Sequence, residues 1–323
     1  MMKENKFINN DVLAAARLMR DLEDRVPGAL ERLKSLYLNT GRAYVIGVTG
    51  APGSGKSTLV DRMIDVFRKE GKSVGVVAVD PSSPFSGGAI LGDRVRMQRH
   101  ATDEGVFIRS LATRGCLGGL CRAAQDIVNV MDAMGKDIII VETVGVGQNE
   151  VDVVHMAHTS IVVLVPGMGD EMQAIKAGIV EIGDIFVINK CEREGAGKTE
   201  GDLRLALELA GRREDGWEIP IVRTEAISGK GIPELISGIY LHKDMLEQSG
   251  GLAAKLRERM KITFLKVLES MVMEHFLDKI EKQGLWDSLL SGLVERRTDP
   301  YTLAERIMYE EFAHEVSQSK PKT

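Results

Sequence analysis

Residues 50–57 read Gly-Ala-Pro-Gly-Ser-Gly-Lys-Ser and match the pattern GxxxxGK[ST], which constrains the fold more than any other feature of this 323-residue chain. The pattern requires a strand before it and a helix after it, and the apolar run YVIGVT directly precedes it. Its glycines allow the backbone to curve so that successive N–H groups point at an anion, and the N-terminus of the following helix also favours negative charge. We therefore predict a phosphate-binding loop that leads into a helix.

The side chains at the end of this loop have separate predicted roles. Lys56 is expected to reach the β- and γ-phosphates of a nucleotide, and Ser57 is expected to place its hydroxyl on Mg²⁺. Thr58 is expected to lie near the α-phosphate. The candidate nucleotide-binding residues of this segment are Gly50, Ala51, Pro52, Gly53, Ser54, Gly55, Lys56, Ser57 and Thr58.

Short apolar runs rich in β-branched residues alternate with helical stretches from residue 44 onward. Uninterrupted runs of this kind are typical of strands that are buried on both faces of a parallel sheet. The alternation predicts βαβ units and an α/β fold, namely a three-layer P-loop NTPase domain with a mostly parallel sheet. The expected strands are 44–48, 74–79, 138–141, 161–165, 185–188 and 221–222, and the expected helices between them are 56–70, 117–134, 200–212 and 232–247.

Helical segments flank this domain on both sides. Leucines recur at three- and four-residue steps over 11–38, with a break at Pro27-Gly28, and three further helical stretches cover 252–316. We predict an N-terminal helical arm over 1–41, the nucleotide-binding domain over 42–247 and a C-terminal helical arm over 248–323. The last arm carries an apolar seam that could be buried within one chain or between two, and we expect a homodimer; the seam comprises Phe264, Leu265, Leu268, Val272 and Phe276.

Composition excludes several classes of protein. Lys and Arg total 42 and Asp and Glu total 47, so the net charge is −5, whereas a general nucleic-acid binder carries a basic surplus. No uncharged apolar run reaches about 18 residues, the length that a membrane-spanning helix requires. The three cysteines lack CxxC spacing, which predicts a reducing compartment and no disulfide framework. We therefore expect a cytoplasmic protein that binds neither nucleic acid nor membrane.

A second motif follows the apolar run Ile138–Val141. A carboxylate at the end of such a strand, here Glu142, is typical of a Walker B element that holds the Mg²⁺ shell. Gly145 follows three residues later, where its backbone N–H could reach the γ-phosphate. Lys56, the loop amides and Mg²⁺ are therefore expected to stabilise the charge that develops during phosphoryl transfer, and Lys56 and Glu142 are the catalytic candidates of these two motifs.

A third motif, Asn189-Lys190-Cys191-Glu192, follows the apolar run 185–188 and resembles the NKxD guanine-specificity element. In that element the acid accepts hydrogen bonds from guanine N1–H and the 2-amino group, which adenine cannot offer. Glu192 keeps the carboxylate on a side chain one methylene longer. Asn189 and Lys190 are expected to brace the loop and the base, and the backbone around Ala226 is expected to touch the base oxygen. The predicted ligands are therefore GTP and GDP.

Longer runs around these motifs carry a family resemblance: VDPSSPFSGGAILGDRVRM (79–97), SLATRGCLGGL (110–120), ETVGVGQNEVDV (142–153) and PGMGDEMQAIKAGIVEIGDIFVINK (166–190). Together with the motifs above, they resemble the MeaB/ArgK family of methylmalonyl-CoA-mutase-associated P-loop GTPases. The resemblance covers about residues 40–250 and extends more weakly into both arms. Glu192 stands where the family usually has Asp, and Asn149 stands where Ser is common.

The resemblance implies roles for four further residues. Asp80 and Asp93 fall on the family's switch I acids, which approach the Mg²⁺ site, so the implied metal residues are Ser57, Asp80, Asp93 and Glu142. Residues 142–148 would be switch II, and 167–178 would be an additional switch. Its responsive charges would be Asp170 and Lys176.

The resemblance also implies a partner. The protein would be a Mg²⁺-dependent GTPase that hydrolyses GTP slowly and acts as a switch for an adenosylcobalamin-dependent acyl-CoA mutase of the methylmalonyl-CoA mutase type. It would gate cofactor loading and protect the mutase from inactivation. The cobalamin would belong to that partner and its adenosyltransferase.

Two other classes of function stay open. A metallochaperone GTPase would usually carry a His-rich tract or a close Cys cluster, and the chain has neither. A kinase of a transport protein would need an acceptor site and a base for a hydroxyl, and the sequence shows no such constellation. His155 and His158 stand at i, i+3 spacing without a third ligand nearby, so we interpret them as a pair on a helix surface rather than as a metal site.

Overall fold

The computed structural model describes residues 12–80, 98–112, 119–143, 156–167 and 180–318. The chain divides into two compact units, Met1–Thr263 and Phe264–Thr323, and the division falls inside helix α12 (Gly251–Lys282). The domain boundaries expected near residues 41 and 247 stay a prediction.

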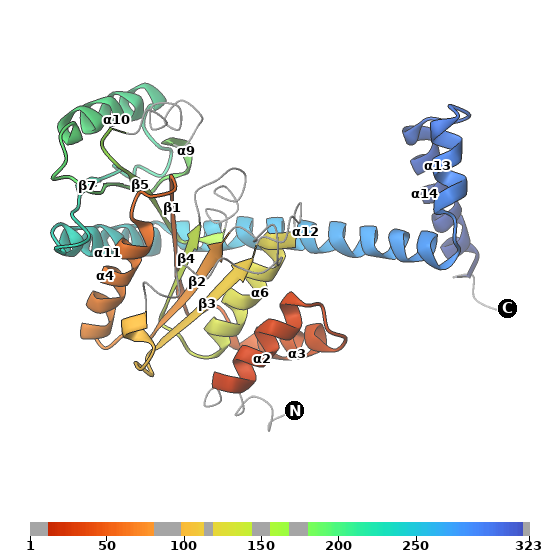
Figure 1. The fold of residues 1–323 in the computed structure, drawn as a ribbon, viewed down its shortest axis with the longest axis horizontal. Coiled ribbons are helices and arrows are strands. Elements are labelled where there is room, and N and C mark those ends of the chain that lie inside the picture. The colour runs from red at the N-terminus through yellow and green to blue at the C-terminus, as the bar shows by residue number, and fades with distance from the viewer. Residues whose placement is uncertain (1–11, 81–97, 113–118, 144–155, 168–179, 319–323) are drawn as a thin grey trace. The chain divides into compact units, whose positions relative to one another are not determined.

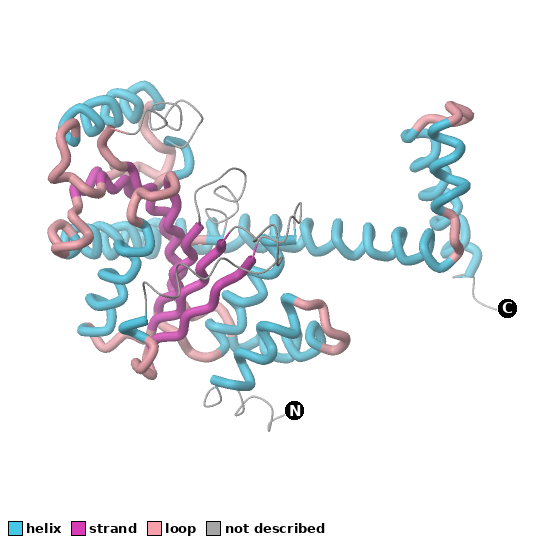
Figure 2. The backbone as a smooth tube through the Cα atoms, viewed as in Figure 1, coloured by secondary structure: helices cyan, strands magenta, loops and turns pink. Residues whose placement is uncertain are grey.

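A seven-stranded parallel sheet forms the centre of the first unit, in the order β3-β2-β4-β1-β5-β6-β7 (Figure 1). Figure 2 shows these strands side by side, with helices around them. The predicted α/β fold with a parallel sheet is confirmed. The strands are β1 (Tyr44–Gly50), β2 (Val74–Asp80), β3 (Val106–Ala112), β4 (Ile138–Thr143), β5 (Thr159–Leu164), β6 (Ile185–Ile188) and β7 (Ile221–Arg223).

Helices cover both faces of the sheet because successive side chains of each buried strand point to opposite faces. Along β1, Val45 packs with α2, α3 and α6, whereas Ile46 and Val48 pack with α4 and α11. A smaller cluster joins α9 and α10 to β5 and β6. Besides the first part of α12, the described helices of this unit are α2 (Val12–Glu23), α3 (Ala29–Leu36), α4 (Lys56–Lys69), α6 (Gly119–Ala133), α9 (Val180–Ile182), α10 (Ala196–Ala210) and α11 (Ile232–Ser249), with short 3-10 turns at Tyr37–Asn39 and Gln98–His100.

Strand β3 is not among the strands predicted from the sequence. It lies at the edge of the sheet and pairs only with β2, and the polar residues Arg109 and Ser110 interrupt its apolar run. The guanidinium of Arg109 is stabilised from outside the sheet, because its Nη2 donates to Glu23 Oε2 of α2 at 2.6 Å. Arg109 and Glu23 are 86 positions apart in sequence, so the residues around Arg109 do not reveal this ion pair or the strand that it stabilises.

A buried carboxylate gathers cations at the amino ends of β5 and β6. Asp184 is 3% exposed and accepts hydrogen bonds from Ser160 N, Arg213 Nη1 and Lys255 Nζ at 2.9–3.1 Å. Lys255 comes from the first turns of α12, so this contact fixes the start of that helix against the sheet. His242 Nε2 lies 3.5 Å from Asp184 Oδ1.

His158 belongs to the same end of the sheet. It is buried directly before β5, where its Nδ1 accepts a hydrogen bond from Val45 N at 2.9 Å and its ring stacks on Tyr44. The interpretation of His158 as a helix-surface residue is therefore wrong. His155 lies outside the described residues.

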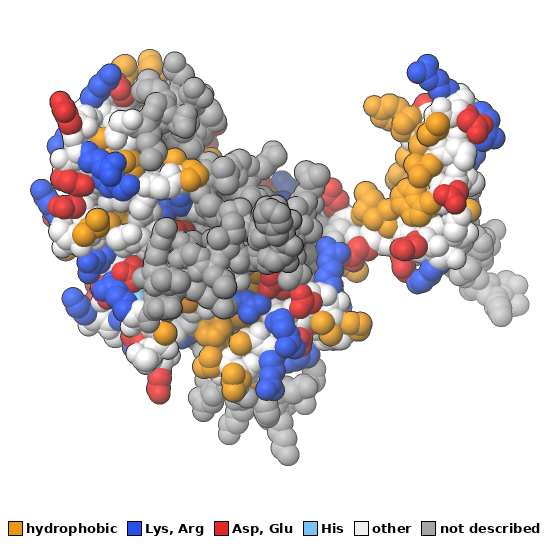
Figure 3. Space-filling model, viewed as in Figure 1, with side chains coloured by type: hydrophobic (Ala, Val, Ile, Leu, Met, Phe, Trp, Pro, Cys, Tyr) orange, Lys and Arg blue, Asp and Glu red, His pale blue; other side chains and the backbone are white. Residues whose placement is uncertain are grey.

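The second unit consists of helices: the last part of α12, α13 (Trp286–Val294) and α14 (Pro300–Gln318). Asp299 caps α14, because its Oδ1 accepts hydrogen bonds from the backbone N–H groups of Tyr301 and Thr302 at 2.9 Å. Hydrophobic side chains gather on the face of this unit that Figure 3 shows. Many of its large apolar side chains are exposed, including Phe264, Leu265, Leu268, Met271, Val272, Met273, Trp286, Leu290, Val294 and Tyr301.

Among the helices of the described segments, none combines the length and the apolar character that crossing a bilayer requires.

Candidate nucleotide-binding site

The predicted motifs meet at one edge of the sheet. In a parallel sheet the carboxyl ends of all strands lie at the same edge, and β1, β4 and β6 end directly at the three motifs. Loops at this edge are the common ligand-binding position of open α/β sheets. The site is therefore built from elements that are far apart in sequence.

Two glycines of the first loop are required by close contacts. Gly50 has a φ of +139°, and a Cβ on it would lie 2.1 Å from Val163 O of β5. Gly55 has a φ of +90°, and a Cβ there would lie 2.4 Å from Asn189 Nδ2. A Cβ at Gly50 would collide with fixed backbone, whereas a Cβ at Gly55 would have to displace the Asn189 amide and adopt an unfavourable positive φ.

Lys56 is the first residue of α4, and its side chain folds back over the loop. Its Nζ donates to Gly50 O at 2.7 Å and to Ala51 O at 3.0 Å, and the residue is only 5% exposed. The ammonium is therefore held among the loop's own backbone groups. The side chain is therefore already ordered at the loop, and its contact with phosphate oxygens stays a prediction.

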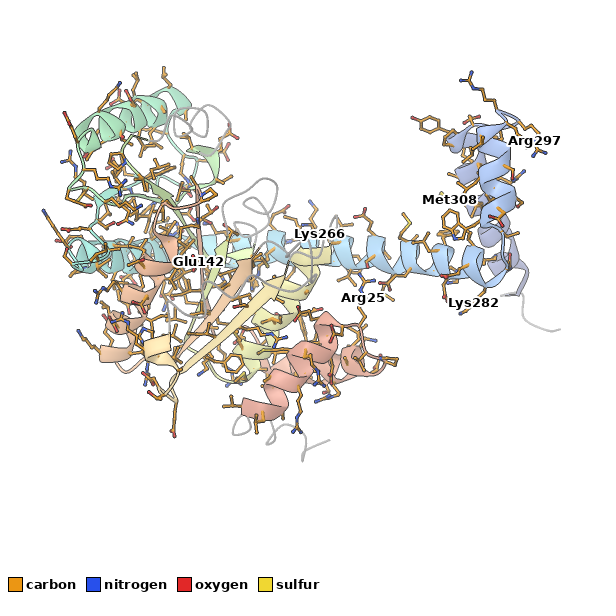
Figure 4. The ribbon with its side chains drawn as sticks, viewed as in Figure 1. Arg25, Glu142, Lys266, Lys282, Arg297 and Met308 are labelled. Carbon is orange, nitrogen blue, oxygen red and sulfur yellow. The ribbon has the colours of Figure 1, made fainter. Side chains whose placement is uncertain are left out.

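Ser57 and Glu142 bring α4 and β4 together. Ser57 Oγ donates to Glu142 Oε1 at 2.7 Å, and both residues are buried. Figure 4 labels Glu142 within the first unit. Next to them Thr143 Oγ1 donates to Thr49 Oγ1 at 3.0 Å, so β1 and β4 are also connected by side chains. A hydroxyl and a carboxylate are oxygen ligands of the kind that Mg²⁺ prefers. This pair therefore fits the divalent cation that a nucleotide site of this kind implies.

Asn189 connects the third motif to the first loop and to the loop after β7. Its Nδ2 donates to Ser54 O at 2.8 Å, and its Oδ1 accepts from Thr224 Oγ1 and Ala226 N, both at 3.1 Å. The neighbouring Lys190 donates from Nζ to Gly53 O at 2.7 Å. The first loop, the third motif and the loop after β7 thus form one hydrogen-bonded assembly. Glu192 follows in a turn and is exposed.

Several predicted residues have no described side chain. The backbone of Asp80 ends β2, opposite Ala112 in the register, but its side chain is not described. Asp93, Gly145, Asp170 and Lys176 lie outside the described residues. The roles expected for all five stay predictions.

Arg62 is a residue of this region that sequence reasoning missed. It lies on α4, and its guanidinium donates to the carbonyl oxygens of Ala226 and Ile227 in the loop after β7. These contacts join residues 164 and 165 positions apart, so no local pattern reveals them. Within the described segments, no group of three or more His, Cys, Asp or Glu side chains is arranged to hold a metal ion.

The parallel sheet and this arrangement of motifs define the P-loop nucleotide hydrolase class. The family model described as Methylmalonyl Co-A mutase-associated GTPase MeaB matches residues 15–281. The chain belongs to the MeaB family of GTPases, and the resemblance predicted from its motifs is confirmed.

Individual relatives agree with this assignment. A Pyrococcus abyssi protein named "Putative GTPase" is 50% identical over 302 residues, which are 93% of each chain. The GTPase ArgK of Escherichia coli is 34% identical over 295 residues, 89% of each chain. The mouse protein named methylmalonic aciduria type A homolog, mitochondrial, is 37% identical over 253 residues, covering 77% of this chain and 61% of the mouse protein. A solved structure of an LAO/AO transport system kinase has a TM-score of 0.69 and 26% identity, covering 97% of each chain.

Proposed function

We propose that this GTPase is a Mg²⁺-dependent molecular switch for an adenosylcobalamin-dependent acyl-CoA mutase of the methylmalonyl-CoA mutase type. It gates cofactor loading and protects the mutase from inactivation, and an adenosyltransferase is a further partner. The family description, which names methylmalonyl Co-A mutase, supports the choice of partner. The observation that carries the catalytic part is the 2.7 Å contact between Ser57 and Glu142 beside the Lys56 loop.

The chain contributes charge stabilisation rather than covalent chemistry. Lys56 and the loop N–H groups hold the phosphate oxygens and stabilise negative charge that develops on them. Ser57 and Glu142 hold Mg²⁺, with Asp80 and Asp93 approaching it directly or through water. When bound, Mg²⁺ supplies charge neutralisation at the phosphates. Gly145 offers its backbone N–H to the γ-phosphate.

The base is read by the remaining motifs. Glu192 accepts hydrogen bonds from guanine N1–H and the 2-amino group, Asn189 and Lys190 brace the loop, and the backbone around Ala226 meets the base oxygen. The contacts of Asn189 with both Ser54 and Ala226 support this arrangement. They hold the phosphate loop (residues 50–57) and the loop after β7 (residues 224–231, the base loop) in one assembly.

The switch is completed by a partner. Among the side chains that the structure describes we assign none to the attacking water, so we expect slow intrinsic hydrolysis that the mutase accelerates. Asp170 and Lys176 in segment 167–178 are proposed to transmit that coupling. The exposed apolar side chains of the second unit support a homodimer, because a contiguous apolar surface is costly in water and a second chain could cover it.

Incubation with γ-labelled GTP separates this proposal from its alternatives. A GTPase switch releases labelled free phosphate, whereas the kinase activity named for the similar solved structure would transfer the label to a protein acceptor. Lys56→Ala should abolish phosphate release, while Lys69→Ala, an exposed lysine at the end of the same helix, should release phosphate at the wild-type rate. Unchanged turnover in the Lys56 variant would place the phosphate site elsewhere.

A further inference from the structure

We propose that Arg62 is a positioning residue for guanine recognition: from the phosphate-binding helix it fixes the base loop so that backbone N–H groups meet the base oxygen. The inference rests on the proposed guanine recognition by the Asn189 and Ala226 motifs. It adds a specificity role for a side chain that belongs to none of the sequence motifs.

The contact itself is a fork on two successive peptides. Arg62 Nε donates to Ala226 O at 3.0 Å, and its Nη2 donates to Ile227 O at 2.5 Å. Arg62 Nη1 lies 3.7 Å from Asp65 Oδ2 on the same helix, which orients the guanidinium. The planar fork has fixed donor directions, so it specifies the orientation of both carbonyl groups, which a single point charge cannot do.

Fixing the two carbonyls also fixes two donors. In a trans peptide the C=O and the N–H of the same plane point in opposite directions. With the oxygens of Ala226 and Ile227 turned toward Arg62, the N–H groups of Ile227 and Ser228 are turned away from it. Backbone donors oriented in this way match guanine, which presents an acceptor at O6, and not adenine, which presents an amino group there.

The base loop is thereby held from two directions. Ala226 is 3% exposed, and its N–H donates to Asn189 Oδ1, while its carbonyl oxygen accepts from Arg62. Both holding side chains also connect to the phosphate site, Asn189 through Ser54 O and Arg62 through α4 itself. Arg62 lies six residues after Lys56, about 9 Å along the helix axis. One rigid helix therefore sets the distance between the phosphate site and the base loop.

The test compares nucleotides that differ at one atom of the base. GDP and 6-thio-GDP differ only at the base oxygen, which sulfur replaces as a weak acceptor. GDP and IDP differ in the 2-amino group, which Glu192 is proposed to read. Inorganic tripolyphosphate has no base and reports on the phosphate loop alone. ADP serves as the reference for guanine recognition. Calorimetric affinities for these five ligands are measured with wild type, Arg62→Ala, Arg62→Lys and Arg68→Ala.

Arg68→Ala is the matched control. Arg68 is on the same helix, but its guanidinium binds Asp103 and Lys72 O instead of the base loop. A general loss of helix packing would therefore affect both arginine variants, whereas a loss of loop orientation would affect only the first.

We expect wild type to prefer GDP over 6-thio-GDP by about 3- to 10-fold, the value of one hydrogen bond. In Arg62→Ala this preference should shrink to less than about twofold, with Arg62→Lys intermediate, because lysine cannot hold both carbonyls in one plane. The preference for GDP over IDP and the affinity for tripolyphosphate should stay at the wild-type values in Arg62→Ala. Arg68→Ala should keep both preferences and the tripolyphosphate affinity at the wild-type values.

Three results would overturn the inference. The first is an unchanged preference for GDP over 6-thio-GDP in Arg62→Ala. The second is a loss of tripolyphosphate affinity in Arg62→Ala that equals its loss of GDP affinity. The third is a wild type that binds 6-thio-GDP as tightly as GDP while still preferring GDP over ADP. A wild type that binds GDP and ADP equally would instead overturn the proposed guanine recognition, on which this inference rests.

Discussion

Ser57 Oγ and Glu142 Oε1 lie 2.7 Å apart, which places the first turn of α4 directly against the end of β4. The two residues are 85 positions apart in sequence and both are buried. Their oxygens are close enough to belong to the coordination shell of one cation. The contact therefore connects the element proposed to hold the phosphates to the element proposed to hold the metal.

Glu142→Gln tests the metal part of this arrangement. The amide keeps the shape of the side chain and removes its charge, so we expect the Mg²⁺ concentration for half-maximal GTP hydrolysis to rise by about tenfold or more, a loss of about 1.4 kcal/mol. Phosphate release is measured across a Mg²⁺ titration. Glu31→Gln, at an exposed position of α3, serves as the control. An unchanged Mg²⁺ dependence in the Glu142 variant would remove this residue from the metal site.

Glu192 carries the prediction on base selectivity. We expect GTP and GDP to bind at least about tenfold more tightly than ATP and ADP, or about 1.4 kcal/mol. Glu192→Ala should reduce this difference to near zero because the acceptor for guanine N1–H and the 2-amino group is lost. Glu194→Ala, two positions along the same exposed turn, should leave it intact. Equal affinities of the wild type in a calorimetric titration would contradict guanine recognition.

The central part of the fold could be predicted because its signals are local. The strands before residues 50, 142 and 189 are uninterrupted apolar runs, and each motif follows its strand directly. Because the carboxyl ends of parallel strands lie at one edge of a sheet, the motifs that follow these strands can be placed at that edge from the sequence alone. Lys56, Ser57, Glu142 and Asn189 accordingly lie together, although their roles stay predictions.

The features that were missed depend on partners distant in sequence. Arg109 is compatible with strand β3 because Glu23 of α2 pairs with it, and Arg62 acts on a loop more than 160 positions away. His158 was misinterpreted because its spacing from His155 imitates a helix. The ring is in fact buried against Tyr44 and bonded to Val45 N. Long-range contacts of this kind leave no periodic trace in the sequence.

Stability should fall as the pH is lowered below neutrality. Burial, with Arg259, Lys255 and Lys243 nearby, lowers the pKa of His158 from 6.5 to about 3, and burial lowers the pKa of His242 to about 4 against the opposing effect of Asp184. The unfolded chain therefore binds more protons than the folded chain between pH 6.5 and about 4. Each histidine lowers the free energy of unfolding by up to about 1.4 kcal/mol per pH unit in that window, and the contribution is fully present above pH 6.5.

Urea unfolding at pH 7.5, 6 and 5 measures this dependence. His158→Asn keeps an acceptor for Val45 N and removes the titrating ring, so the loss of stability with falling pH should become smaller. His275→Asn, at an exposed position, should keep the wild-type dependence. A His158 variant with the same pH dependence as wild type would show that this ring does not contribute.

The second unit is expected to form a homodimer. Leu268 and Val272 are one helical turn apart on α12 and are 46% and 45% exposed in the single chain. Replacing both with Glu should prevent burial of this surface in a partner, so the variant should sediment as a monomer while the wild type sediments as a dimer at micromolar concentration. Lys282→Glu, at an exposed polar position of the same helix, should remain dimeric. A monomeric wild type would contradict the proposed contact.

The rate of GTP hydrolysis with and without an adenosylcobalamin-dependent methylmalonyl-CoA mutase tests the central claim most directly. Phosphate release is measured for wild type, Asp170→Ala and Lys176→Ala, each at saturating GTP and Mg²⁺. We predict that the mutase accelerates the wild type. We also predict that either variant keeps the basal rate and loses about 5- to 150-fold of the acceleration, the usual range of a coupling free energy between two sites. Full acceleration in both variants would remove segment 167–178 as the transmitter, and a wild-type rate that is the same with and without the mutase would contradict the account as a whole.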